Sequence, residues 1–370
     1  MLNLLYIFAT GALLLLSFLM ISRVQQSNRR ANNWFSVFLF CTFCVFLDDC
    51  FVILALEDQV SFLLDLLNIP LFALAPALYL SVSCFTYPSK KFLRIEILHF
   101  LPVLMYILFP ILVLSLFDLK TIEHYLEDFG AWLGLFLVSF MFLQIGIYTI
   151  LSLLKIHRHQ KNIRLFVSST DQIDLSWLQY FLYGVASLVL LWLGEYVIPH
   201  LSDYVYAGYF LGVYYLAYFV LRQKEIFPFT AHQTQEIIEV MEEIKATEEK
   251  RNALFPHIDL KSEIVRLNEL MQSQKPYLDN ELNLPKLAQH FERSNHELSF
   301  ILNDGLHENF YEFVNRYRVE ESKRLLLDSQ YRHLNMLGIA FEAGFNSKTA
   351  FNTAFKKMTG KTPSEYRKSG

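Results

Sequence analysis

Long apolar runs dominate the first 225 residues of this 370-residue chain, and a mixture of apolar and polar positions replaces them afterwards. A helix needs about 20 predominantly apolar residues to cross the hydrocarbon core of a bilayer. Seven segments have this character, and we expect each of them to form a transmembrane helix. They are roughly residues 2–21, 34–56, 63–85, 97–117, 129–154, 175–198 and 204–221.

Basic residues gather in every second connection between these segments, and this pattern predicts the orientation. One set of connections holds twelve Lys and Arg residues, whereas the opposite set holds Lys120 alone. Cytoplasmic loops retain their Lys and Arg residues, so we expect the N-terminus outside and the C-terminus in the cytoplasm. The first segment is expected to be an uncleaved anchor, because its charges follow the apolar run. The twelve are Arg23, Arg29, Arg30, Lys90, Lys91, Arg94, Lys155, Arg158, Lys161, Arg164, Arg222 and Lys224.

Four acidic side chains fall within the apolar segments: Asp48, Asp49, Asp65 and Glu195. Ionisable side chains inside a bilayer are costly and indicate a functional site by default. Under the expected topology, all four lie in the outer third of their helices. Two interpretations stay open. The four residues line an outward-facing pocket for a cation or an amine-bearing ligand, or they are hydrated at the membrane surface or hydrogen-bond to neighbouring helices.

A polar, helix-forming stretch follows the last apolar segment. We therefore divide the chain into a transmembrane sensor or anchor domain (residues 1–225), a cytoplasmic helical linker (226–275) and a soluble domain (276–370). Within the linker, an apolar stripe recurs at spacings of four, three and four residues, as at a coiled-coil seam. The stripe is short, so it is either a dimer seam between two copies or a face that packs on the next domain. Its members are Leu260, Ile264, Leu267 and Met271.

The soluble domain repeats one pattern twice: a short helix, a tight turn and a second short helix. In the first copy, Ser294 and Glu297 form a capping box that begins the second helix. In the second copy, Asn346 and Ser347 begin the helix that follows a turn at Gly344. The expected helices are residues 284–291, 310–328 and 337–343, together with helices that begin near residues 294, 347 and 363.

The helix after each turn has one apolar face and one polar face. Two helix-turn-helix units joined by a long helix would place two recognition helices in the major groove, roughly 34 Å apart. Asn and Lys side chains hydrogen-bond to base edges, and Ser, Thr and Lys also bind phosphates. A single pattern of this kind usually means an ordinary helical hairpin, but two capped copies in tandem favour DNA binding. The expected outward residues are His296, Ser299, Phe300 and Asn303, then Lys348, Thr349, Asn352, Thr353, Lys356 and Lys357.

Residues 275–370 also resemble the AraC/XylS family of regulators. The most specific stretch is residues 339–347, with Phe351, residues 355–357, Gly360 and residues 362–367; residues 317–319 and 325–326 match the joining helix of the family. The resemblance implies binding to promoter DNA and activation through RNA polymerase. It also implies base contacts from His296, Ser299, Phe300, Lys348, Thr349 and Thr353, and phosphate contacts from Ser347, Asn352 and Lys356.

The two units differ in ways that predict unequal roles. Glu292 stands where the second unit has Gly344, and a non-glycine residue in a left-handed turn costs about 1–2 kcal/mol. Residues 276–315 carry two Lys or Arg against seven Asp or Glu, whereas residues 316–370 carry eleven against five. Phosphate neutralisation dominates affinity for DNA, so we expect the second unit to bind more strongly.

These observations predict an all-α protein: a seven-helix transmembrane bundle, a helical linker and a tandem helix-turn-helix domain. We expect a sensor in the bacterial inner membrane that activates transcription in response to an unknown small-molecule or envelope stimulus. Its expected partners are the lipid bilayer, promoter DNA and RNA polymerase, and a second copy of the chain if the linker stripe is a dimer seam. We expect no enzymatic activity, cofactor or metal site. Two alternatives stay open: proteolytic release of the tail, and a membrane receptor or transporter whose tail binds protein partners.

Overall fold

The computed structural model describes residues 2–22, 28–87, 94–117, 119–170, 173–195, 198, 202–222, 239 and 254–369. Within these ranges, the named elements are all helices, which agrees with the expected all-α class. The chain divides into two compact units. The first comprises Met1–His157 and Leu175–Ile226, and the second comprises Arg158–Asp174 and Phe227–Gly370.

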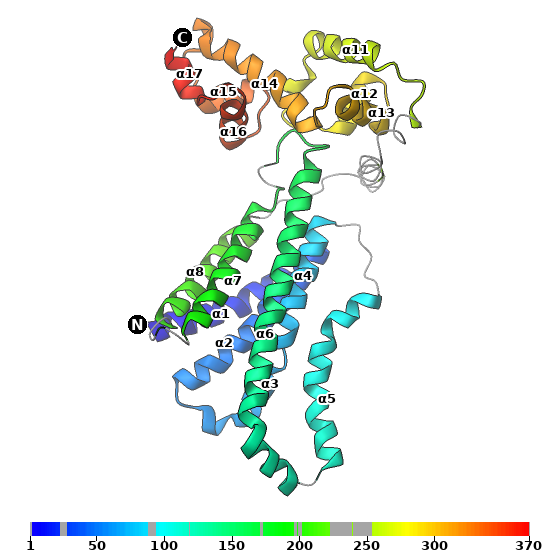
Figure 1. The fold of residues 1–370 in the computed structure, drawn as a ribbon. Coiled ribbons are helices and arrows are strands. Elements are labelled where there is room, and N and C mark those ends of the chain that lie inside the picture. Colours follow the sequence, from blue (N-terminus) through cyan, green and yellow to red (C-terminus); the bar gives the residue numbers. More distant parts are fainter. Residues whose placement is uncertain are drawn as a thin grey trace. The chain divides into compact units, whose positions relative to one another are not determined.

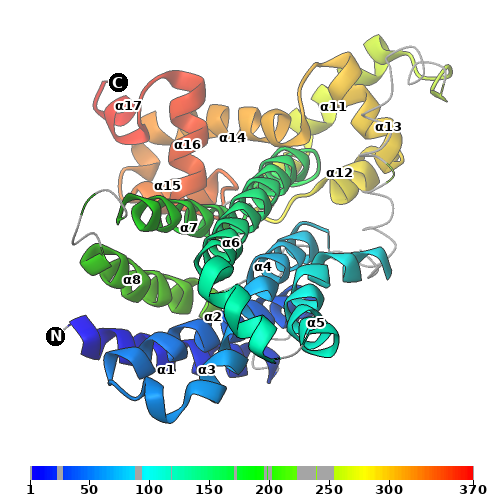
Figure 2. The ribbon, with the colours of Figure 1, turned by 60° about the horizontal axis from the view of Figure 1, so that its bottom comes forward.

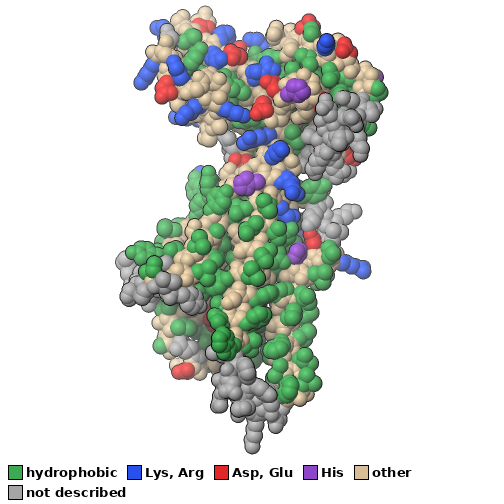
Figure 3. Space-filling model, viewed as in Figure 1, with side chains coloured by type: hydrophobic (Ala, Val, Ile, Leu, Met, Phe, Trp, Pro, Cys, Tyr) green, Lys and Arg blue, Asp and Glu red, His purple; other side chains and the backbone are tan. Residues whose placement is uncertain are grey.

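The first compact unit consists of long apolar helices, arranged as Figure 1 shows. Helix α2 packs along both α1 and α4, and α8 packs against α1 and α7. Helix α5 buries none of its residues, and apolar side chains cover the outside of these helices (Figure 3). The helices are α1 (Leu2–Ile21), α2 (Arg29–Ile53), α3 (Ser61–Asn68), α4 (Leu71–Thr86), α5 (Leu101–Leu116), α6 (Leu119–Ile163), α7 (Ser176–Glu195) and α8 (Ser202–Leu221).

Six helical stretches of the described residues are long and apolar enough to cross a membrane, and Ala207–Leu221 is a shorter apolar helix. The expected segment 63–85 is interrupted between α3 and α4, where Pro70 precedes the first residue of α4. Proline lacks a backbone N–H and disfavours helical geometry in the residue before it. The expected helix 129–154 is longer than predicted, because α6 extends over Leu119–Ile163.

The second compact unit contains two apolar cores that share helix α14 (Phe310–Leu327). Its first half contributes Phe310 and Phe313 to one core, and its second half contributes Leu325 and Leu326 to the other. Figure 2 shows α14 running from the α11–α13 group to the α15–α17 group. The predicted joining helix is therefore present. The remaining helices are α11 (Leu260–Ser273), α12 (Leu284–Phe291), α13 (Asn295–Phe300), α15 (Met336–Glu342), α16 (Lys348–Thr359) and α17 (Pro363–Ser369).

Polar residues precede the helices of the second compact unit. The first N–H groups of a helix have no partner within it, so a polar side chain just before the helix can accept them. A side-chain oxygen at the N-cap accepts one of them and is typically worth about 1 kcal/mol. The predicted capping box of Ser294 and Glu297 is present. The N-cap residues with such a bond include Asn283, Ser294, Asn309, Asn335 and Ser347.

The apolar stripe of α11 packs into the first core. Leu267 and Met271 are fully buried there, and Leu260 and Ile264 pack against the same cluster. Of the two alternatives for this stripe, the structure therefore supports packing on the next domain.

Candidate nucleic-acid interface

Helix α16 presents a polar face that its own sequence pattern explains. Ser347 caps the helix by accepting the N–H of Ala350 at 3.0 Å. The inward face consists of Ala350, Phe351, Ala354 and Phe355, all buried. The predicted site residues occupy the other face: Lys348, Thr349, Thr353 and Lys356 are exposed, and Ser347 and Asn352 are partly exposed.

Two of the three lysines of α16 are available to an external anion. Lys357 forms an ion pair with Glu312 at 3.0 Å. Lys348 and Lys356 form no ion pair within the part of the chain that the structure describes. Lys and Arg side chains are plentiful on the second compact unit (Figure 3). The exposed face of α16 therefore combines free ammonium groups with hydroxyl groups, a set that suits phosphates and base edges.

The turn before α16 requires glycine. Gly344 has a φ of +88°, and a Cβ atom there would lie 2.2 Å from the carbonyl oxygen of Tyr277. The next residue, Phe345, is fully buried, and its N–H bonds to the carbonyl of Ala340 at 2.8 Å. The tight turn thus fixes α16 against both α15 and the Tyr277 backbone.

Arg318 on α14 holds the same backbone in place, a role that sequence reasoning missed. Its side chain is fully buried and donates to the carbonyls of Tyr277 and Asp279, each at 2.8 Å. Its guanidinium also lies over the Phe345 ring, 5.7 Å from the centroid. Burial lowers the pKa of Arg318 to about 10, so it remains a cation at neutral pH. Arg318 therefore positions the turn at Gly344, in the second helix-turn-helix unit, relative to the first core.

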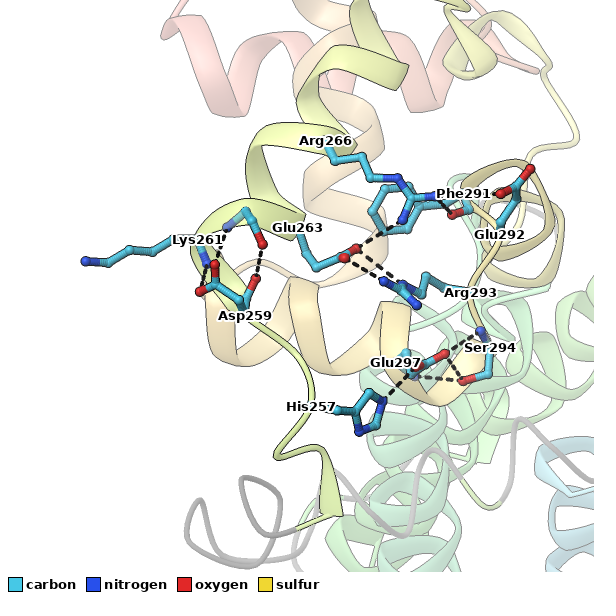
Figure 4. Close-up of polar contacts among 11 residues, drawn as sticks. His257, Asp259, Lys261, Glu263, Arg266, Phe291, Glu292, Arg293, Ser294 and Glu297 are labelled. Atoms are coloured by element: carbon cyan, nitrogen blue, oxygen red, sulfur yellow. Dashed lines mark hydrogen bonds and ion pairs between the residues drawn. The ribbon is translucent and has the colours of Figure 1, made fainter.

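The first helix-turn-helix unit has the same motif but a different turn. Glu292 adopts a left-handed conformation with φ 55°, which is the geometry considered from the sequence. Arg293 in the same turn donates to Glu263 at 2.6 Å, and Arg266 donates to the carbonyl of Phe291 at 3.0 Å. Figure 4 shows both arginine contacts where α11 meets the turn. Ion pairs to α11 therefore support this turn.

The polar face expected on α13 is largely covered, which corrects the prediction. Ser299 and Phe300 were expected to face outward, but they are only 4% and 5% exposed. The Phe300 ring packs against Phe255, with 5.0 Å between centroids. His257 contacts Glu297 of the capping box at 3.1 Å (Figure 4). Residues 254–258 thus lie over α13, and His296 remains only partly exposed.

The electrostatics of the first unit favour the same covered arrangement. Although burial acts to raise it, the pKa of Glu297 is lowered by hydrogen bonds from Ser294 and His257. The side chain of Asn303, also expected outward, is partly buried and donates to the Ser299 carbonyl at 2.8 Å. Polar groups near α13 are therefore committed to each other rather than to a groove.

The acidic residues of the apolar half lie partly together. The hydroxyl of Tyr6 donates to Asp49 at 2.5 Å, and Asp48 interacts electrostatically with Asp49 and Asp65. The side chain of Glu195 lies outside the described residues. Among the described residues, no group of three or more His, Cys, Asp or Glu side chains could hold a metal ion.

Comparison with known proteins identifies the C-terminal domain. Residues 287–369 match a helix-turn-helix domain family. Uncharacterized HTH-type transcriptional regulators from several strains of Staphylococcus aureus are 29% identical over 102 residues. The match covers 28% of this chain but only 13% of the relatives. Residues 287–369 therefore form a helix-turn-helix domain, and the relatives that share this region are named as transcriptional regulators.

A solved structure shows a further likeness. It is the C-terminal domain of a two-component response regulator from Fusobacterium nucleatum, 27% identical, covering 29% of this chain and 98% of that structure. The TM-score is 0.25, so this likeness adds nothing about how the chain is arranged.

Proposed function

We propose that this chain is a membrane-embedded transcription regulator that binds promoter DNA through its C-terminal helix-turn-helix domain. One observation carries the proposal: the exposed face of α16 gathers Lys348, Thr349, Thr353 and Lys356, while its other face is buried. Such a face fits the major groove, where side chains at the start of a recognition helix reach base edges.

The two units take unequal roles in this proposal. In the second unit, Lys348, Thr349 and Thr353 contact bases, and Ser347, Asn352 and Lys356 contact phosphates. In the first unit, His296 retains partial exposure, while Ser299 and Phe300 are buried, and Phe255 covers the Phe300 ring. Base contacts by Ser299 and Phe300 would require that cover to move.

The apolar half is the membrane anchor and the sensor of the proposal. We expect seven spans with the N-terminus outside, which places the DNA-binding domain in the cytoplasm of a bacterial cell. Helix α5 is apolar but buries none of its residues against the other helices. Proteins in water rarely expose an apolar surface of that size, so the surface of α5 supports a lipid environment. Asp48, Asp49, Asp65 and Glu195 are the candidate ligand-binding residues. Activation would proceed through contact with RNA polymerase.

The proposal is tested with the full chain reconstituted in nanodiscs. DNA that crosslinks to the protein in cells is recovered, and its binding to the nanodiscs is titrated over a range of salt concentrations. We expect binding that weakens steeply with salt, because each phosphate contact releases counterions. Absence of binding to every recovered fragment at low salt would refute the DNA-binding proposal and favour a tail that binds proteins.

Cell fractionation separates the remaining mechanisms. The proposal expects the C-terminal domain in the membrane fraction both before and after the promoter responds. A soluble fragment of the size of the tail that accumulates with the response would instead support proteolytic release.

A further inference from the structure

A connection between two apolar helices lies inside the core of the helix-turn-helix domain. Helix α6 ends at Ile163, and residues 158–174 belong to the second compact unit, which also holds the helix-turn-helix domain. Ile163 is 1% exposed, Phe166 2% and Val167 8%. These side chains share one cluster with Leu284 and Phe310, so they fill the first core of the DNA-binding domain. We call residues 163–169 the docking segment.

The backbone of the docking segment satisfies groups that the helices of the domain leave open. The carbonyl of Arg164 accepts the N–H of Tyr311 at 3.0 Å, and the carbonyl of Phe166 accepts the N–H of Leu284 at 2.9 Å. Both N–H groups lie in the first turn of a helix, where no intrahelical acceptor exists. The docking segment therefore completes the starts of α12 and α14.

Side chains extend these contacts to both helix-turn-helix units. Ser168 donates to the carbonyl of Leu282 at 2.7 Å, and its own carbonyl accepts the side-chain amide of Asn315 at 3.0 Å. Ser169 donates to Asn346 at 2.5 Å, directly before α16. Val167 also forms an isolated antiparallel bridge with Asn283. The segment thus touches the first core and the turn of the second recognition helix.

We propose that the docking segment is a permanent part of the DNA-binding domain and that α6 transmits the stimulus to it. The DNA-binding domain is then attached to the apolar half at three places: the end of α6, the start of α7 and the stretch that follows α8. This inference rests on the proposed function and specifies its regulation. A tail cut after α8 would lose the docking segment, expose the core that Phe166 fills and leave Leu284 and Tyr311 without acceptors.

The structural part is tested by disulfide crosslinking in the full chain. Directly paired residues of an antiparallel bridge have Cα atoms about 4.5–5.5 Å apart, within the range that a disulfide joins. Val167→Cys with Asn283→Cys is expressed in native membranes, with a protease site introduced between residues 230 and 250. After mild oxidation and cleavage, we expect more than half of the chains to remain joined until reduction. Each single-cysteine variant is the matched control, and a pair that joins no better than either control overturns the proposal.

The coupling part is tested by removing the docking contacts. Phe166→Asp with Val167→Asp is compared with Arg158→Ala and Lys161→Ala, both at exposed positions. Hydrogen exchange at the amides of Leu284 and Tyr311 is expected to accelerate at least tenfold in the aspartate variant, and promoter response to be lost. Unchanged exchange and unchanged response would overturn coupling through α6.

The two proposals fail separately. Crosslinking of Val167→Cys to Asn283→Cys requires no DNA, so a crosslinked protein that binds no DNA refutes only the proposed function. A protein that binds DNA without forming the crosslink refutes only the docking proposal.

Discussion

The two helix-turn-helix units share a motif but differ in what surrounds their recognition helices. Helix α16 has an open face on which Lys348 and Lys356 form no ion pair with the described residues, whereas α13 is covered by Phe255 and His257. The turn before α16 is closed by Gly344, whereas the turn before α13 contains the strained Glu292 and is braced by the ion pair of Glu263 and Arg293. One duplicated pattern thus produces a unit with an open polar face and a unit that packs against its neighbours.

The largest expected effect breaks the turn of the second unit. Gly344→Ala combines left-handed strain of about 1–2 kcal/mol with a backbone clash of about 1–3 kcal/mol. We expect the opening free energy of α16, measured by hydrogen exchange in the full chain, to fall by about 3 kcal/mol. Gly360→Ala is the matched control, because Gly360 has φ +74° but no atom near its missing Cβ. Equal losses at both positions would show that the contact with Tyr277 has no energetic role.

The next effect separates the two recognition helices by affinity for DNA. Lys348→Ala with Lys356→Ala removes one base contact and one phosphate contact, which should weaken binding by about 30-fold at physiological salt and reduce the salt slope by about 1. His296→Ala in the first unit should weaken binding by less than about threefold, because α13 is covered. Lys261→Ala on α11 removes one exposed charge outside the recognition helices and is the control for a general loss of positive charge. Fluorescence anisotropy with nanodiscs gives the values, and equal effects of the two helices would contradict the unequal roles.

Local sequence signals predicted much of this comparison. Ser294, Ser347 and Thr362 are capping residues whose partners lie three positions away, so the starts of α13, α16 and α17 follow from neighbouring residues. The buried face of α16 likewise follows from helical periodicity. The unequal charge of the two units was readable directly from the chain.

Contacts between distant residues were not predictable in the same way. Phe300 is buried because Phe255, from the preceding linker, packs on it, and nothing local indicates that pairing. Arg318 has no sequence signal for complete burial, since arginine is almost never fully buried unless it is paired. The docking segment did leave a trace: Leu165, Phe166 and Val167 are consecutive apolar residues in a connection otherwise rich in charge.

A smaller effect relieves the turn of the first unit. Glu292→Gly removes the cost of a left-handed non-glycine residue, and we expect α13 to gain about 1 kcal/mol in opening free energy. The side chain is 86% exposed and its ion pair with Arg266 is long, 3.9 Å, so little is lost. Glu292→Ala keeps the strain and should change stability little. A glycine variant no more stable than the alanine variant would contradict strain at this turn.

The smallest effect concerns the pH dependence of the first unit. The pKa of Glu297 is lowered in the folded chain, so its contribution is present above the ordinary value of 4.5 and is lost as the pH falls through the lowered value. We expect a loss of about 0.5–1 kcal/mol at α13, the size of a capping interaction. Hydrogen exchange of α13, corrected for its intrinsic pH dependence, measures it. Glu297→Gln should lack this loss, and an identical pH profile in that variant would remove the capping box as its origin.

The most direct test of the account is whether the open face of α16 meets DNA on the cytoplasmic side of a membrane. A cysteine replaces Thr353, which is exposed on that face, and a membrane-impermeant maleimide reports its accessibility. Ser364→Cys on α17 is the exposed control, and the parent chain shows any labelling of its own cysteines. The account predicts no labelling in intact cells, labelling after permeabilisation, and protection of Thr353→Cys but not Ser364→Cys by DNA recovered from the cellular crosslink. Labelling of Thr353→Cys in intact cells, or equal labelling with and without that DNA, would contradict it.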